Sequence, residues 1–195
     1  MNLFYAPGAC SLANHIALIE AGLPYSLISV DREKRTQDGR DFLAINPKGY
    51  VPALEFDDGT VLTENLAILT YIAERSGRLL AEKGLDRWRA LEATAFMTSE
   101  LHNTFKPLFY PDTSDAQKEK SRATLIRRFA TLADQLGEKP FLIGEHMSIA
   151  DAYLFVMLSW AANFKIDLPK PFESYFNRLK AMPSVAQALK EEGLS

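Results

Sequence analysis

The pattern of apolar and polar positions predicts alternating strands and helices in the first 77 residues. Residues 2–5 form a short apolar run, and after a Pro-Gly pair the apolar side chains from Leu12 to Ile19 recur at helical spacing. A second apolar run follows at residues 25–30. A strand, a helix and a strand in so short a passage imply two parallel strands joined by a right-handed crossover. The pattern therefore predicts a βαβ unit at the start of the chain.

A hairpin is the next element that the sequence predicts. Residues 51–56 and 60–63 are apolar runs that flank Asp-Asp-Gly at 57–59. Asp-Gly between such runs is a strong hairpin signal, because both central positions of the turn need positive φ. Helical spacing resumes at Leu66 and ends near Gly77. The order βαβ and then ββα is that of a thioredoxin-like domain.

Beyond residue 80 the two-residue alternation gives way to helical periods alone. Leu125, Phe129, Leu132 and Leu136 follow one helix face, each three or four residues after the last. The segment between the two patterns is polar and mixed. We therefore expect an α/β plus all-α organisation. Its parts are a thioredoxin-like domain at residues 1–77, a linker at 78–85 and an all-helical C-terminal domain at 86–195.

A capping box precedes the most apolar stretch of the chain. Ser148 and Asp151 have the spacing of the box, with Asp at the position that Glu or Gln usually holds, and we expect a structural cap there. The apolar stretch at residues 152–162 is shorter than the roughly 20 residues that a helix needs to cross a bilayer. It is typical of a buried core helix.

Composition and charge limit the classes of function that this protein can have. The chain has 195 residues, 47% of them apolar and 24% charged, which is the balance of a globular protein. A net charge of −3 and the lack of a long basic run argue against nucleic acid as a partner. The first 15 residues lack the basic start and apolar core of an export signal. One cysteine permits neither an internal disulfide nor a multi-cysteine metal site, so we expect a reducing, cytoplasmic setting and no membrane partner.

That cysteine, Cys10, is the strongest candidate for chemistry. It follows the Pro-Gly turn and precedes a predicted helix, and a helix N-terminus favours a thiolate by lowering the thiol pKa from its usual ~8.5 toward neutrality. The alternative is a small buried hydrophobic residue. A dithiol oxidoreductase would have a second cysteine at position 13, where this chain has Ala13. A thiolate at Cys10 must therefore act with an external thiol.

Several motifs together resemble those of one enzyme family. Tyr-Ala-Pro-Gly-Ala-Cys-Ser at residues 5–11, Asn-Pro-Lys-Gly-Tyr-Val-Pro-Ala-Leu at 46–54 and Leu-Thr-Glu-Asn-Leu-Ala-Ile at 62–68 resemble the bacterial beta-class glutathione transferases. Glu-Leu-His at 100–102 and Ser-Ile-Ala-Asp-Ala-Tyr-Leu-Phe at 148–155 continue the resemblance in the family's order. It covers essentially the whole chain. The resemblance implies glutathione as co-substrate, no metal, and a homodimer.

The resemblance also implies the residues that act on the glutathione sulfur. Cys10 would either hydrogen-bond that thiolate or form a mixed disulfide with it, and His102 would share the task. Ser99 lies three residues before His102 and so projects from the same helix face. Glu100 and Leu101 would border the peptide. Without the resemblance, His102 would be interpreted as a core histidine.

Four further residues would bind the rest of the tripeptide. Glu64 would take the γ-glutamyl ammonium and Asn65 its carboxylate, although the family more often has Ser at the second position. The Val51 backbone, before a cis proline, would pair with the cysteinyl unit. Arg35, or Lys34 in its place, would lie near the glycyl carboxylate.

The chain is thus interpreted as a glutathione S-transferase that conjugates the glutathione thiolate to small apolar electrophiles. Four aromatic residues, Phe105, Phe109, Tyr110 and Trp160, are candidates for the apolar wall of that pocket, and each could equally belong to the core. One alternative is a glutathione-dependent thiol transferase or disulfide reductase that uses Cys10. Another is a non-catalytic protein of the transferase fold that binds apolar ligands.

Overall fold

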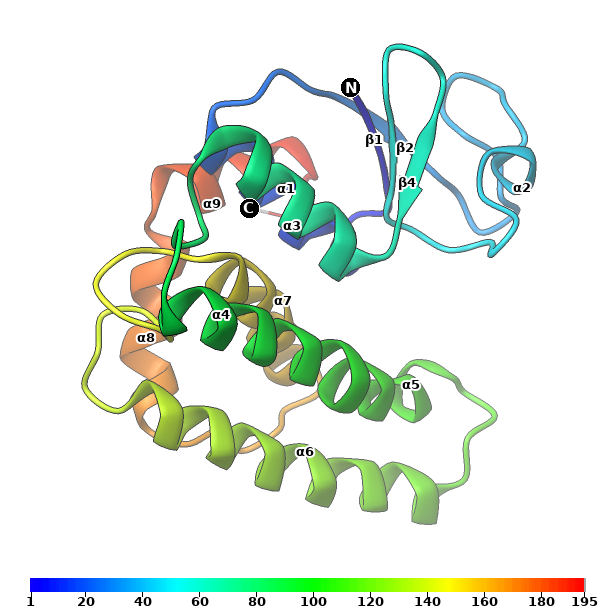
Figure 1. Ribbon diagram of the computed structural model, residues 1–195. Coiled ribbons are helices and arrows are strands. Elements are labelled where there is room, and N and C mark those ends of the chain that lie inside the picture. Colours follow the sequence, from blue (N-terminus) through cyan, green and yellow to red (C-terminus); the bar gives the residue numbers. More distant parts are fainter. Residues whose placement is uncertain (195) are drawn as a thin grey trace. The chain divides into compact units, whose positions relative to one another are not determined.

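The computed structural model describes residues 1–194 and divides into two compact units. The first unit contains residues 1–80 together with the segment from Met182 onward, and the second contains Ala81–Ala181. Figure 1 shows the helices and strands coloured along the chain from blue to red.

The first unit is built around a four-stranded sheet. Its elements are β1 (Asn2–Tyr5), α1 (Ser11–Ala21), β2 (Ser26–Ser29), α2 (Phe42–Ile45), β3 (Ala53–Glu55), β4 (Val61–Thr63), α3 (Asn65–Ser76) and α9 (Pro183–Glu191). The strand order is β2-β1-β3-β4, with β1 parallel to β2 and the other two pairs antiparallel. The predicted βαβ and ββα halves and the thioredoxin-like order are confirmed. The short helix α2, capped by the Asp41 side chain, lies outside the predicted pattern.

The hairpin of β3 and β4 forms at Asp-Asp-Gly as predicted, but its turn differs from the expected type. Among its central residues only Gly59 has positive φ, at 82°. The Gly59 amide donates to the Phe56 carbonyl at 2.9 Å, and the Phe56 amide donates to the Thr60 carbonyl at 2.9 Å. Asp58 has no positive φ, and its carboxylate accepts hydrogen bonds from the amide and the hydroxyl of Thr60. One glycine therefore suffices to close the hairpin.

The two faces of the sheet are covered by different apolar groups. Phe4 and Ala53, which pair across β1 and β3, pack with Val30 and Phe42. Leu3 and Leu54 are the next pair along and point to the opposite face, because successive side chains of a strand alternate. Both are fully buried. The helices α1 and α3 pack against each other and contact strands of this sheet.

The last helix belongs to the first unit, which corrects one expectation. The sequence assigns residues 86–195 to a single helical domain, but α9 packs on α1 and joins residues 1–80. Val185 and Ala188 on α9 are fully buried. The spacing of apolar residues along a helix does not show which of the two units the helix packs in. The sequence pattern therefore assigned this segment to the wrong unit.

The second unit is helical. It contains α4 (Leu85–Phe96), η1 (Met97–His102), α5 (Asn103–Phe109), α6 (Asp115–Leu136), α7 (Ile149–Asn163) and α8 (Pro171–Lys180). The predicted stripe from Leu125 to Leu136 on α6 is buried, and α7 is buried along nearly its whole length. Among the helices of residues 1–194, none combines the length and the apolar character that a membrane-spanning segment requires.

The capping box at the start of α7 is confirmed, and it does more than cap the helix. Both carboxylate oxygens of fully buried Asp151 accept hydrogen bonds: from the amide and hydroxyl of Ser148 at 2.8 and 2.7 Å, from the Leu142 amide at 2.7 Å, and from the Tyr175 hydroxyl at 2.6 Å. Burial raises the pKa of Asp151, and these hydrogen bonds oppose that rise. One side chain thus joins α7, α8 and the loop before α7.

Candidate functional site

Cys10 lies at the N-cap of α1, directly after the turn formed by residues 6–10. The Ala9 amide donates to the Ala6 carbonyl at 3.0 Å, and Gly8 has φ of 69°, which a glycine adopts without strain. Only 8% of Cys10 is exposed. Its Sγ donates to the Val51 carbonyl at 3.4 Å, and the Val51–Pro52 peptide bond is cis. The structure therefore brings Cys10 and Val51 together.

The expected lowering of the Cys10 pKa is wrong for this structure. Burial raises the pKa of the thiol to about 12, and the nearby Glu64 carboxylate raises it further. Hydrogen bonds from the Cys10 and Ser11 amides act in the opposite direction but are outweighed. The helix N-terminus is present as predicted, but removal of the sulfur from water dominates. Cys10 is therefore a neutral thiol at pH 7 and can donate a hydrogen bond.

This raised pKa predicts how Cys10 reacts with an alkylating reagent. In the folded protein the thiolate forms only as pH approaches 12, so the rate of labelling by iodoacetamide should still be rising at pH 10. The unfolded chain should titrate near its ordinary value of ~8.5. Cys10 is the only cysteine, so intact-mass spectrometry measures its labelling directly. A midpoint below pH 8 in the folded protein would contradict the buried neutral thiol.

Glu64 lies at the N-cap of α3 and points its carboxylate at side chains rather than at the helix. It has φ of 75° and ψ of 126° and makes no capping hydrogen bond. Its Oε1 accepts from Lys48 Nζ at 2.5 Å and from the Tyr50 hydroxyl at 3.2 Å. The hydrogen bond from Lys48 lowers the pKa of Glu64, which is a carboxylate at pH 7. Lys48 and Tyr50 were not predicted, because no local period links them to Glu64.

Asn65 is the first residue of α3 and is buried, with 5% exposed. Its side-chain Nδ2 and Oδ1 are enclosed without a hydrogen-bond partner, and its carbonyl accepts from Asn14 Nδ2 at 3.4 Å. The side-chain amide is thus covered rather than presented at the surface. The backbone amides of the first helical turn remain the donors that this position offers to an anion.

Arg35 lies apart from these residues. It is exposed in the loop after β2, where its amide donates to Asp31 Oδ1 at 2.7 Å. Its backbone also forms an isolated antiparallel β-bridge with Asp41. Within residues 1–194, no hydrogen bond or ion pair joins its side chain to Cys10, Val51 or Glu64. The structure therefore groups three predicted residues of the first unit with Asn65 and leaves Arg35 outside their contacts.

The second unit holds the other four predicted residues on η1, a π-helical turn. Such turns often accompany functional sites. Ser99 is exposed and donates to the Ala95 carbonyl at 3.1 Å. Glu100 forms an ion pair with Arg128, which also donates to the Glu100 carbonyl at 2.8 Å. Leu101 is fully buried, which leaves its side chain no exposed surface for a ligand.

His102 ends this turn in an apolar setting. Its Nδ1 lies 2.8 Å from the Tyr153 hydroxyl, and its ring packs edge-on against Trp160 with centroids 5.0 Å apart. Burial, assisted by the charge of Lys106, lowers the pKa of His102 to about 4. The imidazole is therefore neutral at pH 7. A neutral ring carries one N–H donor and one acceptor nitrogen.

Comparison with known proteins decides the family. Residues 8–75 match the family described as the glutathione S-transferase N-terminal domain, and residues 96–182 match the glutathione S-transferase C-terminal domain. The protein GstA of Escherichia coli O157:H7, a glutathione S-transferase, is 42% identical, with 100% of each chain covered. The chain belongs to the glutathione S-transferase family.

Solved structures of this family support the same assignment. A sphingomonad glutathione S-transferase complexed with glutathione is 42% identical, and a beta-class enzyme from Sphingomonas chungbukensis is 41% identical. Each gives a TM-score of 0.91, with 100% of both chains covered. The predicted resemblance to the bacterial beta class is therefore confirmed.

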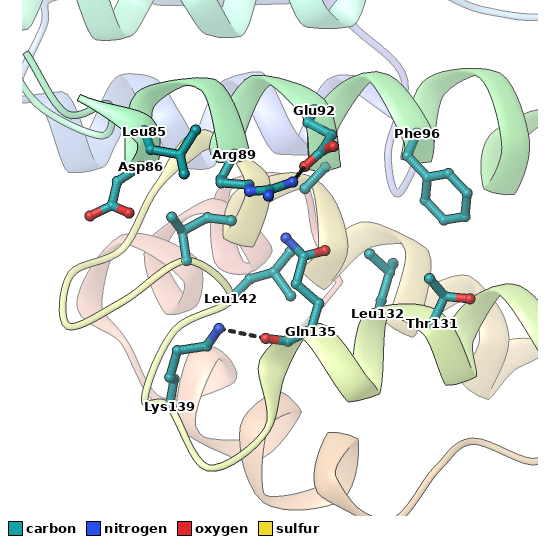
Figure 2. Close-up of a pocket in the computed structure, with 12 residues that line it drawn as sticks. Leu85, Asp86, Arg89, Glu92, Phe96, Thr131, Leu132, Gln135, Lys139 and Leu142 are labelled. Atoms are coloured by element: carbon teal, nitrogen blue, oxygen red, sulfur yellow. Dashed lines mark hydrogen bonds and ion pairs between the residues drawn. The ribbon is translucent and has the colours of Figure 1, made fainter. Parts of the chain in front are cut away.

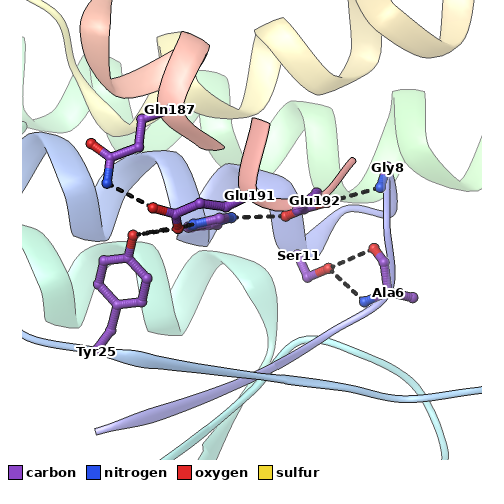
Figure 3. A network of polar contacts seen from close by, with 8 residues as sticks. Ala6, Gly8, Ser11, Tyr25, Gln187, Glu191 and Glu192 are labelled. Carbon is purple, nitrogen blue, oxygen red and sulfur yellow. Dashed lines mark hydrogen bonds and ion pairs between the residues drawn. The ribbon is translucent and has the colours of Figure 1, made fainter. Parts of the chain in front are cut away.

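The structure of this glutathione S-transferase also connects its C-terminal helix to the turn before Cys10. His15 on α1 is fully buried between two carboxylates: Nε2 lies 2.8 Å from Glu191 Oε2, and Nδ1 lies 3.0 Å from Glu192 Oε1. Glu192 Oε2 accepts from the Gly8 amide at 2.9 Å (Figure 3). His15 therefore has a structural role. Its partners lie 176 and 177 residues away, so no local signal could identify them.

A separate cavity lies within the second unit of this transferase, between α4 and α6 (Figure 2). Its volume is about 510 Å³, and Arg89 and Glu92 form an ion pair on its wall. None of the predicted glutathione residues lines it. In the described part of the chain, no cluster of three or more His, Cys, Asp or Glu side chains could hold a metal ion.

Proposed function

We propose that this transferase binds glutathione beside Cys10 and conjugates its thiolate to a small apolar electrophile. The observation that carries the proposal is the neutral Cys10 thiol, held within one unit beside the Val51 carbonyl and near the Glu64 carboxylate. A neutral thiol can donate to a sulfur anion but cannot readily attack a disulfide. The geometry therefore favours conjugation.

The predicted residues would supply a partner for each polar group of the tripeptide. Glu64 would take the γ-glutamyl ammonium, and the first amides of α3 at Asn65 would take the neighbouring carboxylate. The Val51 backbone would pair with the cysteinyl unit, and Arg35 would approach the glycyl carboxylate. On the second unit, Ser99, Glu100 and the backbone of Leu101 would border the peptide, because the Leu101 side chain is fully buried. These assignments rest on the family resemblance together with the contacts described above.

The reaction would be displacement or addition by sulfur. The glutathione thiol loses its proton, its sulfur bonds to an electrophilic carbon, and in a displacement the leaving group departs with the electron pair of the broken bond. A hydrogen bond from Cys10 to the sulfur anion stabilises the thiolate and lowers the pKa of the glutathione thiol. Neutral His102 would serve as a second hydrogen-bonding group at the sulfur.

The redox alternative requires different chemistry. A Cys10 thiolate would attack a glutathione disulfide, form a mixed disulfide and release one glutathione as thiolate. Burial of Cys10 disfavours that thiolate, and Ala13 offers no second sulfur for an internal disulfide. A non-catalytic binding protein would have no chemical need for Cys10, Glu64 and His102 together.

The electrophile, the partners and the cellular location complete the proposal. Phe105 and Trp160 are buried, whereas Phe109 is 48% exposed and stacks edge-on against Trp160 with centroids 5.0 Å apart. Of the four candidates, Phe109 and the exposed Tyr110 would present aromatic surface to an apolar co-substrate. We propose a cytoplasmic homodimer without nucleic-acid or membrane partners.

Two substitutions of Cys10 test the proposal. Cys10→Ala should lower the conjugation rate with a generic aryl halide by about 10- to 100-fold, because a hydrogen bond to a charged group is worth about 1.5–3 kcal/mol. Cys10→Ser keeps a hydroxyl donor and should retain most of that rate. Neither variant should lose glutathione binding, measured by titration calorimetry.

The same proteins distinguish the alternatives. Disulfide reduction that is present in wild type and absent from both variants, with conjugation undiminished in Cys10→Ala, would support thiol transfer instead. Failure of wild type to bind glutathione or to turn over would refute both enzymatic functions and favour the binding protein.

A further inference from the structure

The Lys48 ammonium group is hydrogen-bonded to the Glu64 carboxylate, which the proposed function assigns to the ammonium group of the ligand. Lys48 Nζ donates to Glu64 Oε1 at 2.5 Å and to the Thr63 hydroxyl at 3.0 Å. The Tyr50 hydroxyl donates to the same Glu64 oxygen at 3.2 Å. A primary ammonium held by a carboxylate and a hydroxyl has the same donor chemistry as the α-ammonium of a γ-glutamyl peptide.

The Lys48–Glu64 pair is placed so that it can open. The two side chains are 45% and 48% exposed, so water can solvate either partner when they separate. Exposed ion pairs of this kind contribute little to stability. The pair therefore presents only a small barrier to a competing ammonium.

The backbone at Glu64 indicates that this carboxylate is held for more than an ion pair with Lys48. Its φ of 75° lies in the left-handed region, which a residue with a β-carbon rarely adopts. Glu64 also begins α3 without a side-chain hydrogen bond to the helix. Strained residues that persist in this way occur at ligand-binding sites, and the surrounding structure maintains them.

Charge at this position also affects the sulfur chemistry. The Glu64 carboxylate raises the pKa of Cys10, so an uncompensated negative charge opposes any thiolate nearby. Either Lys48 or a ligand ammonium compensates it. Replacement of one cation by the other keeps the charge around Cys10 balanced during binding.

We propose that Lys48 is an internal counter-ion of Glu64, which the α-ammonium of the γ-glutamyl ligand displaces on binding. This inference rests on the proposed glutathione function and goes beyond it. Lys48 acts through Glu64 and is a positioning residue. Without ligand, Lys48 neutralises the charge of the Glu64 carboxylate. Its competition with the ligand ammonium sets how strongly the site distinguishes ligands that carry an ammonium from those that lack one.

The test combines two ligands with variants of Lys48. Titration calorimetry measures Kd for glutathione and for its deamino analogue, in which a glutaryl group replaces the γ-glutamyl group. In wild type, glutathione must displace Lys48 and the analogue need not. In Lys48→Met, Glu64 lacks its counter-ion, so the ratio of analogue Kd to glutathione Kd should rise by about two- to fivefold, the range typical of an exposed ion pair.

Three controls isolate the effect. Lys48→Arg retains a cation and should keep the wild-type ratio. Lys83→Met removes an exposed lysine of the second unit and should leave both Kd values unchanged. In a Glu64→Gln background, Lys48→Met should no longer change the ratio, because the carboxylate that couples the two cations is absent.

A direct readout follows the displaced group. NMR of the protein with 13C-methylated lysines, assigned with Lys48→Arg, should show the Lys48 signal shift with glutathione and remain unchanged with the deamino analogue. A ratio unchanged by Lys48→Met, or equal weakening of both ligands, would overturn the inference while leaving the proposed function intact. Absence of glutathione binding in wild type would instead overturn the proposed function.

Discussion

Asp151→Ala is expected to lower the free energy of unfolding by about 3–5 kcal/mol, because it leaves several buried donors without an acceptor. Four hydrogen bonds are lost at once, from the Ser148 amide and hydroxyl, the Leu142 amide and the Tyr175 hydroxyl. Water cannot replace the carboxylate, since Asp151 is fully buried. Guanidinium unfolding monitored by circular dichroism measures the change.

A matched control separates this network from ordinary helix capping. Asp115 lies in the first turn of α6 and is exposed. Its interaction with the helix dipole is worth about 0.3–1 kcal/mol, so Asp115→Ala should shift the unfolding midpoint only slightly. Equal destabilisation by the two substitutions would mean that Asp151 stabilises the protein only through the interaction of its charge with the helix dipole.

Glu192→Ala is expected to destabilise the protein by about 3 kcal/mol and to loosen the turn before Cys10, because it leaves two buried hydrogen-bonding groups without their partner. The side chains of Glu192 and His15 are both fully buried, so the His15 ring would lose a carboxylate that water cannot replace. The Gly8 amide would lose its acceptor as well. Calorimetric unfolding measures the change in stability. The rate of Cys10 alkylation at a fixed pH measures how readily the turn opens and exposes the sulfur.

The neighbouring residue supplies the control. Glu191 also contacts His15, but its side chain is 34% exposed and water can take over its contacts. Glu191→Ala should therefore have a smaller effect on stability and leave the rate of Cys10 alkylation near the wild-type value. If Glu192→Ala accelerates alkylation no more than Glu191→Ala does, the link between α9 and the Cys10 turn has no influence on the thiol.

Several site features illustrate what local sequence can predict. The Pro-Gly turn and the apolar period that follows it are adjacent in the chain, and together they predict a helix start at Cys10. Neighbouring residues predict the start of α3 at Glu64 and Asn65 in the same way, and spacing alone predicts the box of Ser148 and Asp151. Such features depend on backbone geometry within a few residues.

Electrostatic features of the site were beyond such a prediction. The direction of the Cys10 pKa shift depends on how completely the sulfur is removed from water by segments distant in sequence, including the Val51 loop. Similarly, Lys48 meets Glu64 across 16 residues, and His15 meets Glu192 across 177. Desolvation and ion pairing depend on distance in space, which a linear pattern does not report.

Local patterns in the sequence suffice to predict the order of strands and helices, the thioredoxin-like and helical parts, the hairpin, the α7 cap and, through the motifs, the family. These follow from hydrophobic periods, turn residues and short-range caps. Three features are set only in the folded chain: α9 joins the first unit, Cys10 is a neutral donor rather than a thiolate, and Lys48 pairs with the carboxylate of Glu64. Each of these depends on which distant side chains exclude water or bring charge to a residue, and that is a property of packing.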